Sequence, residues 1–320
     1  MGKRAFKNIS IILLVLFCVS CSANSKSQIA NINKTSSIDG TQELGSITVE
    51  SPLQLASDKL QSYDEIDKKY KSLKLKYSKN REDYLSDEVF ANFRNVKVGN
   101  IKEGILYRGA SPIDNSMGRA KYANKLIEKA NIKYDIDLTD DEKKKKKHFS
   151  KKDFASEYFK KLYENGQAIC LNMNTNYREQ KYHDRVVKAM IAMSKNDGPY
   201  YVHCVEGKNR TGFVLAVIEG LAGASYEEIV KDHMITFANY YGITEETDKE
   251  KYDIIKAHYI DSMLRYIADC DPWTGNGTIE LSDLDWVNVM GRYLLNNGMS
   301  EDDLHNWYEK LTEENYSDPD

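Results

Sequence analysis

Apolar residues recur along the chain at two alternating spacings, one typical of strands and one typical of helices. The stretch "FANFRNVKVGNIKEGILYRGASP" alternates apolar and polar residues between glycines, which predicts short strands and turns. Next, "GRAKYANKLIEKANIKYDIDLTD" predicts a helix and a strand, "QAICLNM" a second strand and "YHDRVVKAMIAMSK" another helix. "PYYVHC" predicts a third strand that leads into the apolar helix "TGFVLAVIEGLAG". This alternation favours an α/β fold, with a mostly parallel central sheet flanked by helices.

The C-terminal part of the chain carries mainly helical patterns. "SYEEIVKDHMITFANYYG" begins with Ser225 and has Glu228 three residues later, the spacing of a capping box. "SEDDLHNWYEKL" has acidic residues in its first turn, where they stabilise a helix dipole. We therefore expect additional C-terminal helices beside the α/β core.

Changes of composition divide the chain into segments. Residues 22–52 are rich in Ser, Asn and Thr and lack periodicity, which is typical of a flexible linker. Residues 53–86 mix charged and apolar positions at near-helical spacing and predict a helical segment. The main domain is expected over residues 87–313, followed by a tail, residues 314–320.

The N-terminal residues 1–21 have the pattern of an export signal. Basic residues precede "ISIILLVLFCVSC", an apolar run too short to span a bilayer comfortably. Its "VSC" ending resembles the lipobox of bacterial lipoproteins, although Cys18 stands where Leu is usual. This resemblance implies lipidation of Cys21 and a membrane lipoprotein on the extracytoplasmic face. The alternatives are a secreted chain and an uncleaved anchor.

Composition and charge exclude several classes of protein. The net charge of −4 gives no global field for nucleic acid, so we expect no nucleic-acid partner. Outside the signal only Cys170, Cys204 and Cys270 remain, too few for a disulfide framework. Cys170 and Cys270 form either a pair or two buried small side chains, and the second reading is favoured. The dispersed histidines, His183, His233, His258 and His305, have no spacing that predicts a metal site.

The chemically richest stretch is "GPYYVHCVEGKNRTGFV". Cys204 follows a buried apolar strand and precedes a helix, so its thiol lies where unsatisfied N–H groups and the helix dipole favour an anion. Such a position, with a nearby cation, lowers a cysteine pKa from about 8.5 to roughly 3.5–7.5. The pattern therefore predicts a thiolate nucleophile at neutral pH.

Five residues separate Cys204 from Arg210, enough backbone to curl around an oxyanion. Their N–H groups form an anion cradle, with Gly207 at the point that needs a positive φ. Arg210 can hold two phosphate oxygens with its planar fork, and Thr211 can donate its hydroxyl to the sulfur. The expected phosphate-binding residues are Val205, Glu206, Gly207, Lys208, Asn209 and Arg210.

"HCVEGKNRT" resembles the HC-x5-R-T/S signature of the cysteine-dependent protein tyrosine phosphatase superfamily. More narrowly, "HCxxGKxRTG" with the upstream "NFRN" and "LYRGASP" resembles bacterial tyrosine and lipid phosphatases. The resemblance covers Phe90 to Gly242 and implies a tyrosine-phosphatase-like fold. It also implies a two-step reaction without metal or cofactor, in which Cys204 attacks phosphorus and water then hydrolyses the cysteinyl-phosphate.

One departure from those relatives affects proton transfer. Asn209 stands before the arginine, where they commonly carry Asp, and the chain has no "WPD" tripeptide. A positioned general acid contributes about 10² to 10⁴ in rate. Asp137, in the strand "DIDL" that resembles the relatives' "DLR" segment, is the first candidate for this acid, and Asp140 is the second.

The remaining motif residues have two readings each. His203 is expected to support the loop by hydrogen bonding rather than to act as an acid or base. Lys208 either lines the pocket or points to solvent, and Glu206 is expected to face outward. Arg94 and Arg108 either bind substrate or brace the loop. The lysine run "KKKKKHFSKK" is interpreted as a solvated loop in preference to a site for anionic substrates.

The resemblance makes a phosphotyrosine phosphatase the leading hypothesis, with a phosphorylated protein as substrate. Inositol phosphates or phosphoinositides are an alternative that keeps the same chemistry. A second alternative is a pseudophosphatase that binds phosphorylated ligands without turnover, because of Asn209 and the missing acid loop. Rhodanese-like sulfur transfer is disfavoured, because the loop keeps an arginine at the phosphate spacing and runs into Thr211.

Overall fold

The computed structural model describes residues 63–150, 156–270 and 279–313. The expected signal, linker and tail lie outside these residues, as do Cys21 and the side chain of Cys270. Cys170 is a free thiol in the structure. Within the described part of the chain, no helix is both long enough and apolar enough to cross a membrane.

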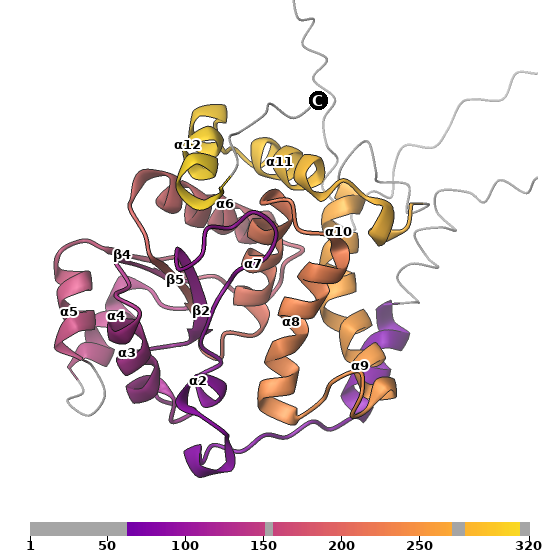
Figure 1. Cartoon of the computed structure of the whole chain (residues 1–320), viewed down its shortest axis with the longest axis horizontal. Coiled ribbons are helices and arrows are strands. Elements are labelled where there is room, and N and C mark those ends of the chain that lie inside the picture. The colour runs from indigo at the N-terminus through magenta and orange to yellow at the C-terminus, as the bar shows by residue number, and fades with distance from the viewer. Residues whose placement is uncertain (1–62, 151–155, 271–278, 314–320) are drawn as a thin grey trace, which may run out of the picture. The chain divides into compact units, whose positions relative to one another are not determined.

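The core of the molecule is a five-stranded sheet of order β1-β2-β5-β3-β4 (Figure 1). β1 pairs with β2 in antiparallel orientation, and the β2–β5, β5–β3 and β3–β4 pairs are parallel. The expectation of a mostly parallel central sheet is therefore confirmed. The strands are β1 (Arg94–Asn95), β2 (Leu106–Ala110), β3 (Tyr134–Asp137), β4 (Ala168–Cys170) and β5 (Tyr200–Cys204).

Helices cover both faces of this sheet, and Figure 1 shows α3 and α5 on one side and α7 and α8 on the other. Residues 63–72 are also helical. The α-helices are α2 (Asp87–Phe90), α3 (Ala120–Lys129), α4 (Glu142–Phe149), α5 (Glu157–Glu164), α6 (Gln180–Lys195), α7 (Asn209–Leu221), α8 (Tyr226–Tyr241), α9 (Lys249–Lys256), α10 (Ser262–Cys270), α11 (Trp286–Asn296) and α12 (Glu301–Leu311). Shorter turns are the 3₁₀ helices η1 (Arg81–Asp83) and η3 (Leu281–Asp283) and the π-helix η2 (Ala257–Asp261).

The two faces of the sheet have different chemistry, because successive side chains of a strand point to opposite sides. Tyr200, Val202 and Cys204 of β5 belong to the large apolar core that also contains α6, α7 and α8. Tyr201 belongs to a smaller core with residues of α3 and α5. In β3, Ile136 lies in the large core, which leaves the next residue, Asp137, on the opposite face.

Two helices after β5 follow directly from the sequence. α7 is apolar around most of its surface and is buried along nearly its whole length, as expected for a helix inside a core. α8 begins with the predicted capping box, in which Ser225 and Glu228 exchange side-chain to backbone hydrogen bonds. It ends at Gly242, whose φ of 64° is typical of a helix C-cap.

Candidate active site

The connection between β5 and α7 carries the sequence motif. β5 is the middle strand of the sheet and pairs in parallel with β2 and with β3. Cys204 is its last residue and α7 begins at Asn209, so residues 205–208 form the whole connection. We call residues 204–210 the cysteine loop. Ligands of α/β folds bind at the carboxyl ends of the strands, which is where this loop lies.

The carbonyl groups of the cysteine loop point outward and are held by neighbouring elements. The Val205 carbonyl accepts from the Ser111 N–H at 3.2 Å, and the Glu206 carbonyl accepts from the Tyr240 hydroxyl at 2.6 Å. The Gly207 carbonyl accepts from Arg108 at 3.0 Å. In a planar trans peptide the N–H points opposite to the C=O. The N–H groups of residues 206, 207 and 208 therefore face the inside of the loop.

Gly207 occupies a position that no other residue fits. Its φ is +66°, in the left-handed region that favours glycine. A Cβ atom built there would lie 2.4 Å from the carbonyl oxygen of Gly109 in β2. The loop thus packs directly against the neighbouring strand, and this close approach fixes its curvature.

The Cys204 thiol lies at the bottom of the loop and is only 3% exposed. Burial acts to raise its pKa, but the positive charge of Arg210 acts in the opposite direction. The hydroxyl and N–H of Thr211 and the N–H of Glu206 also stabilise the thiolate, so that the pKa falls to about 7. At neutral pH a large fraction of this sulfur is therefore ionised, and the thiolate is the nucleophilic form.

Arg210 closes the other end of the loop. Its Nη1 donates to the Met173 carbonyl at 3.0 Å, which orients the guanidinium. Its Nε is buried and has no hydrogen-bond partner among the described residues. The loop therefore brings together a thiolate, inward N–H groups and a guanidinium with an unused donor, an arrangement suited to a tetrahedral oxyanion.

Comparison with protein-family models gives a match to a family described as the tyrosine phosphatase family, over residues 88–313. The chain belongs to this family. The match includes the C-terminal helices α10 to α12, which lie beyond the part of the chain that the motif resemblance covered. Among curated proteins no match was found.

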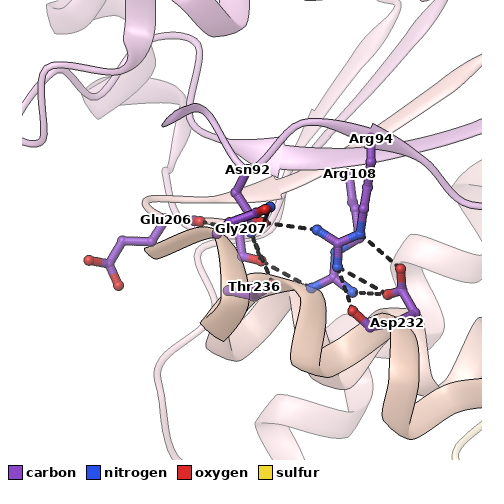
Figure 2. A network of polar contacts seen from close by, with 8 residues as sticks. Asn92, Arg94, Arg108, Glu206, Gly207, Asp232 and Thr236 are labelled. Atoms are coloured by element: carbon purple, nitrogen blue, oxygen red, sulfur yellow. Dashed lines mark hydrogen bonds and ion pairs between the residues drawn. The ribbon is translucent and has the colours of Figure 1, made fainter. Parts of the chain in front are cut away.

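Two arginines of this phosphatase brace the cysteine loop from behind (Figure 2). Arg94 Nε donates to Asp232 Oδ1 at 2.8 Å, and Arg108 Nη1 donates to Asp232 Oδ2 at 2.5 Å. Arg108 also donates to the Gly207 carbonyl and is 1% exposed. The contacts therefore favour the reading that Arg94 and Arg108 brace the loop over the reading that they bind substrate. We call Arg94, Arg108 and Asp232 the arginine brace.

Two buried acids beside the two arginines, Asp232 and Glu219, differ in their charge. Burial acts to raise the pKa of Asp232, but the charges of Arg94 and Arg108 hold it far below its usual range. Burial and the negative charge of Asp232 raise the pKa of Glu219 well above its usual range. A neutral Glu219 thus lies beside an ionised Asp232.

Asn92 completes the support of the loop in this phosphatase. Its Nδ2 donates to the Gly207 carbonyl and to Thr236 Oγ1, both at 3.1 Å. Its Oδ1 accepts from Arg94 at 2.9 Å. The residue has a φ of +50°, which Asn tolerates better than most residues. Asn92 therefore links the loop, β1 and α8.

Lys208 is largely buried and does not point to solvent. Its Nζ lies 3.2 Å from the Tyr241 hydroxyl and 3.3 Å from Glu206 Oε2. The Tyr77 ring lies 5.9 Å from the same ammonium and stacks on Tyr240. Figure 2 shows the Glu206 side chain directed away from the arginine brace. Glu206 thus partly neutralises the charge of Lys208, and the rings of Tyr77 and Tyr241 lie beside its ammonium.

A second buried polar cluster lies on the face of the sheet opposite to the face that Cys204 occupies. His203 Nε2 lies 3.1 Å from Asp135, and Lys145 Nζ lies 3.3 Å from Asp135 and 3.8 Å from Asp137. Burial acts to lower the pKa of His203, but Asp135 and Asp137 raise it to about 9. Asp137 Oδ1 also accepts two backbone N–H bonds, from Thr139 and Asp140. The structure thus places Asp137 among buried ion-pair partners.

Sequence reasoning missed Asn92, Asp232 and Tyr240 as supports of the loop. The "NFRN" motif contained one of them, but only its arginine was interpreted. In α8, Asp232 and Thr236 are spaced four residues apart on a mainly apolar buried face, a signal for a buried polar contact. Among the described residues there is no group of three or more His, Cys, Asp or Glu residues that could hold a metal ion.

Proposed function

We propose that this chain hydrolyses phosphate monoesters, foremost phosphotyrosine in proteins, through a cysteinyl-phosphate intermediate. The observation that carries the proposal is the geometry of the cysteine loop. A thiol with a pKa near 7 lies beneath inward N–H groups and beside Arg210. Each of these groups suits attack on phosphorus.

In the first step the Cys204 sulfur attacks phosphorus, the S–P bond forms and the bond to the leaving oxygen breaks. The transferring group spreads its charge over three equatorial oxygens. The N–H groups of residues 206–208 and the Arg210 guanidinium would hold those oxygens, and such preorganised donors stabilise the transition state.

In the second step water attacks phosphorus and the S–P bond breaks, which releases inorganic phosphate and returns the electron pair to sulfur. The same groups that lower the Cys204 pKa stabilise the leaving thiolate. The hydroxyl and the N–H of Thr211 both act to lower the pKa of Cys204, and Thr211 Oγ1 has no other hydrogen-bond partner among the described residues. The second step therefore depends on Thr211 more than the binding of substrate does.

The surroundings of Lys208 favour an ester with one phosphate on an aromatic ring. Its ammonium is paired with Glu206 and Tyr241, so it offers little free positive charge for a second phosphate. Tyr77 and Tyr241 lie edge to face beside it, with ring centroids 5.4 Å apart. Aromatic walls bind an aryl group through stacked or edge-to-face contacts.

Inositol phosphates or phosphoinositides remain the second candidate substrate class, and the lysines of α4 support it. α4 follows the carboxyl end of β3, at the edge of the sheet that also carries the cysteine loop. Four of its lysines are exposed: Lys143, Lys144, Lys146 and Lys147. Clustered lysines attract polyanionic headgroups.

A substrate panel on the purified full-length chain tests these proposals. Phosphotyrosyl peptide, phosphoseryl peptide, inositol polyphosphate and phosphoinositide vesicles would each be assayed with the native chain and with Cys204→Ser. We expect the highest kcat/KM on phosphotyrosyl peptide and loss of all turnover in Cys204→Ser. A preference for a multiply phosphorylated inositol would mean that the substrate class is inositol phosphates rather than phosphotyrosine. Phosphopeptide binding without turnover would establish the pseudophosphatase alternative.

We also propose that residues 1–21 direct export and that Cys21 carries a lipid anchor. The support is the lipobox-like "VSC" and the apolar run before it. Fractionation of cells that express the chain or Cys21→Ala tests this. Membrane association that Cys21→Ala releases is expected, and equal distribution of both chains would contradict it.

A further inference from the structure

We propose that Asp140 is the general acid that protonates the leaving oxygen, a role that rests on the proposed function of the cysteine loop. The loop itself has Asn209 where an acid would be close to phosphate. A carboxyl group from another element must therefore supply the proton.

The turn after β3 carries Asp140 to the edge of the sheet where Cys204 ends β5. Asp137 pairs with His203 across the parallel strands, and the Leu138 N–H donates to the His203 carbonyl at 3.0 Å. Leu138 thus runs beside Cys204. Asp137 Oδ1 then accepts the Asp140 N–H at 3.0 Å, which fixes the turn two residues beyond that point.

The same turn is hydrogen-bonded to the segment that orients Arg210. The Asp140 carbonyl accepts from the Asn172 N–H at 3.1 Å, and the Leu138 carbonyl accepts from the Met173 N–H at 2.8 Å. The Met173 carbonyl in turn accepts from Arg210. One backbone bridge therefore connects Asp140 with the guanidinium of the cysteine loop and sets their relative position.

The loop at Ser111 carries a second carboxyl group, Asp114, whose charge acts on Asp140. Ser111 donates its N–H to the Val205 carbonyl, and its hydroxyl accepts the Asp114 N–H. The turn that carries Asp140 and the loop that carries Asp114 are therefore both held by backbone hydrogen bonds to the residues around Cys204, the first at His203 and the second at Val205.

The surroundings of Asp140 favour its protonated form. Burial raises its pKa, and the negative charges of Asp137 and Asp114 raise it further. His148 in α4, whose Nε2 lies 3.6 Å from Asp140 Oδ2, and His203 in β5 act in the opposite direction. The net shift is upward, and Asp140 Oδ2 is buried with no hydrogen-bond partner among the described residues. A raised pKa is what a carboxylic general acid needs near neutral pH.

Asp137, the other carboxyl group of this strand, is less suited to the task. Its side chain lies on the opposite face of the sheet from Ile136 and faces the buried ammonium of Lys145. Its Oδ1 already accepts two N–H bonds, which stabilise the ionised form. It therefore positions the turn, whereas no hydrogen bond among the described residues holds Asp140 Oδ2 in its ionised form.

The proton balance of both steps follows from this assignment. In the first step the Asp140 O–H gives its proton to the leaving oxygen as the P–O bond breaks, which leaves a carboxylate. In the second step that carboxylate takes a proton from the attacking water as the S–P bond breaks. The acid is thus restored with each turnover.

Dependence on the leaving group separates this role from a structural one. An alkoxide or phenoxide of high pKa needs the proton, whereas a dinitrophenolate leaves without it. We expect Asp140→Asn to lower kcat on phenyl phosphate about 10² to 10⁴-fold. On dinitrophenyl phosphate it should stay within a few-fold of the native chain. The native kcat on phenyl phosphate should fall at high pH, and this limb should be absent in Asp140→Asn.

Two further variants keep the test decisive. Asp141→Asn, next in sequence, preserves a helix N-cap at α4 and should leave both rates near the native values. Asp137→Asn should lower kcat on phenyl phosphate and kcat on dinitrophenyl phosphate by the same factor. The assignment is overturned if Asp140→Asn lowers both rates equally or neither, or if Asp137→Asn alone produces the leaving-group dependence. Absence of any hydrolysis by the native chain would instead remove the proposed function.

Discussion

The Arg108 guanidinium donates to the carbonyl oxygen of Gly207, and so ties the buried arginine brace to the loop that holds Cys204. Arg108 shares the Asp232 carboxylate with Arg94. Three charges therefore position one peptide group, whose outward carbonyl requires the following N–H to face inward. The shape of the anion cradle depends on this contact.

Removal of Asp232 tests the brace. Asp232→Ala leaves the buried Arg108 guanidinium and the partly buried Arg94 guanidinium without their carboxylate, and breaking a buried ion pair costs about 3–5 kcal/mol. We expect the free energy of unfolding, measured by chemical denaturation, to fall by roughly that amount. Glu103→Gln, which removes the exposed Lys97–Glu103 pair, should leave the denaturation midpoint unchanged. Equal effects of the two substitutions would contradict a bracing role.

Gly207→Ala should damage activity through the position of the loop. A Cβ there meets the Gly109 carbonyl, and a displacement of about 1 Å in an active site costs about 10²-fold in rate. Gly166→Ala is a matched control, because Gly166 also has a positive φ, of 73°, but an added Cβ meets nothing within 4 Å. Full kcat/KM in Gly166→Ala with a large loss in Gly207→Ala is the expected result. Equal rates would show that the close packing is unimportant.

The motif at Cys204 could be predicted from sequence because its parts are adjacent along the chain. A strand, a cysteine, a short loop and an arginine determine one turn of backbone, and the apolar run after Arg210 requires a buried helix. The alternation of strands and helices similarly predicted the parallel sheet, because period-two and helical spacing are local signals.

The arginine brace and the separation of Asp137 from Asp140 could not be predicted in the same way. Arg94 and Asp232 are 138 residues apart and meet only when α8 packs beside β1. Alternation along β3 shows that Asp137 and Ile136 lie on opposite faces of the sheet. Whether Cys204 shares a face with Asp137 depends on how β3 pairs with β5. Pairing is a property of the folded sheet, so the sequence left both carboxyl groups open as the acid.

His203 predicts how stability changes with pH. Its pKa is raised from about 6.5 to about 9 by Asp135 and Asp137, against the effect of burial. A raised histidine pKa gives stability that is complete below about pH 6.5 and is lost as pH rises through 9. We expect the free energy of unfolding to fall by on the order of 3 kcal/mol across that interval.

The thiol of Cys204 titrates in the same interval with the opposite sign, so the measurement belongs in the Cys204→Ser chain. There, His203→Gln should flatten the decline in stability between pH 6.5 and 9. An unchanged slope after His203→Gln would mean that His203 is neutral in the folded chain.

The ionisation of Cys204 predicts the pH dependence of its reactivity. Because the thiolate is the reactive form, the rate of alkylation by iodoacetamide should rise with pH and reach half its maximum near pH 7. Thr211→Val removes one stabilising hydroxyl, so the midpoint should move to higher pH while the plateau remains. A midpoint in Thr211→Val equal to that of the native chain would mean that the hydroxyl does not stabilise the thiolate.

The most direct test of the account is to trap the covalent intermediate. The full-length chain would be mixed with an aryl phosphate labelled at phosphorus, quenched in acid within the first turnover, and digested for mass spectrometry. The account predicts the phosphoryl group on the sulfur of Cys204 and its absence from Cys204→Ser. Turnover with no phosphoryl group on Cys204, or with the group on another residue, would contradict it.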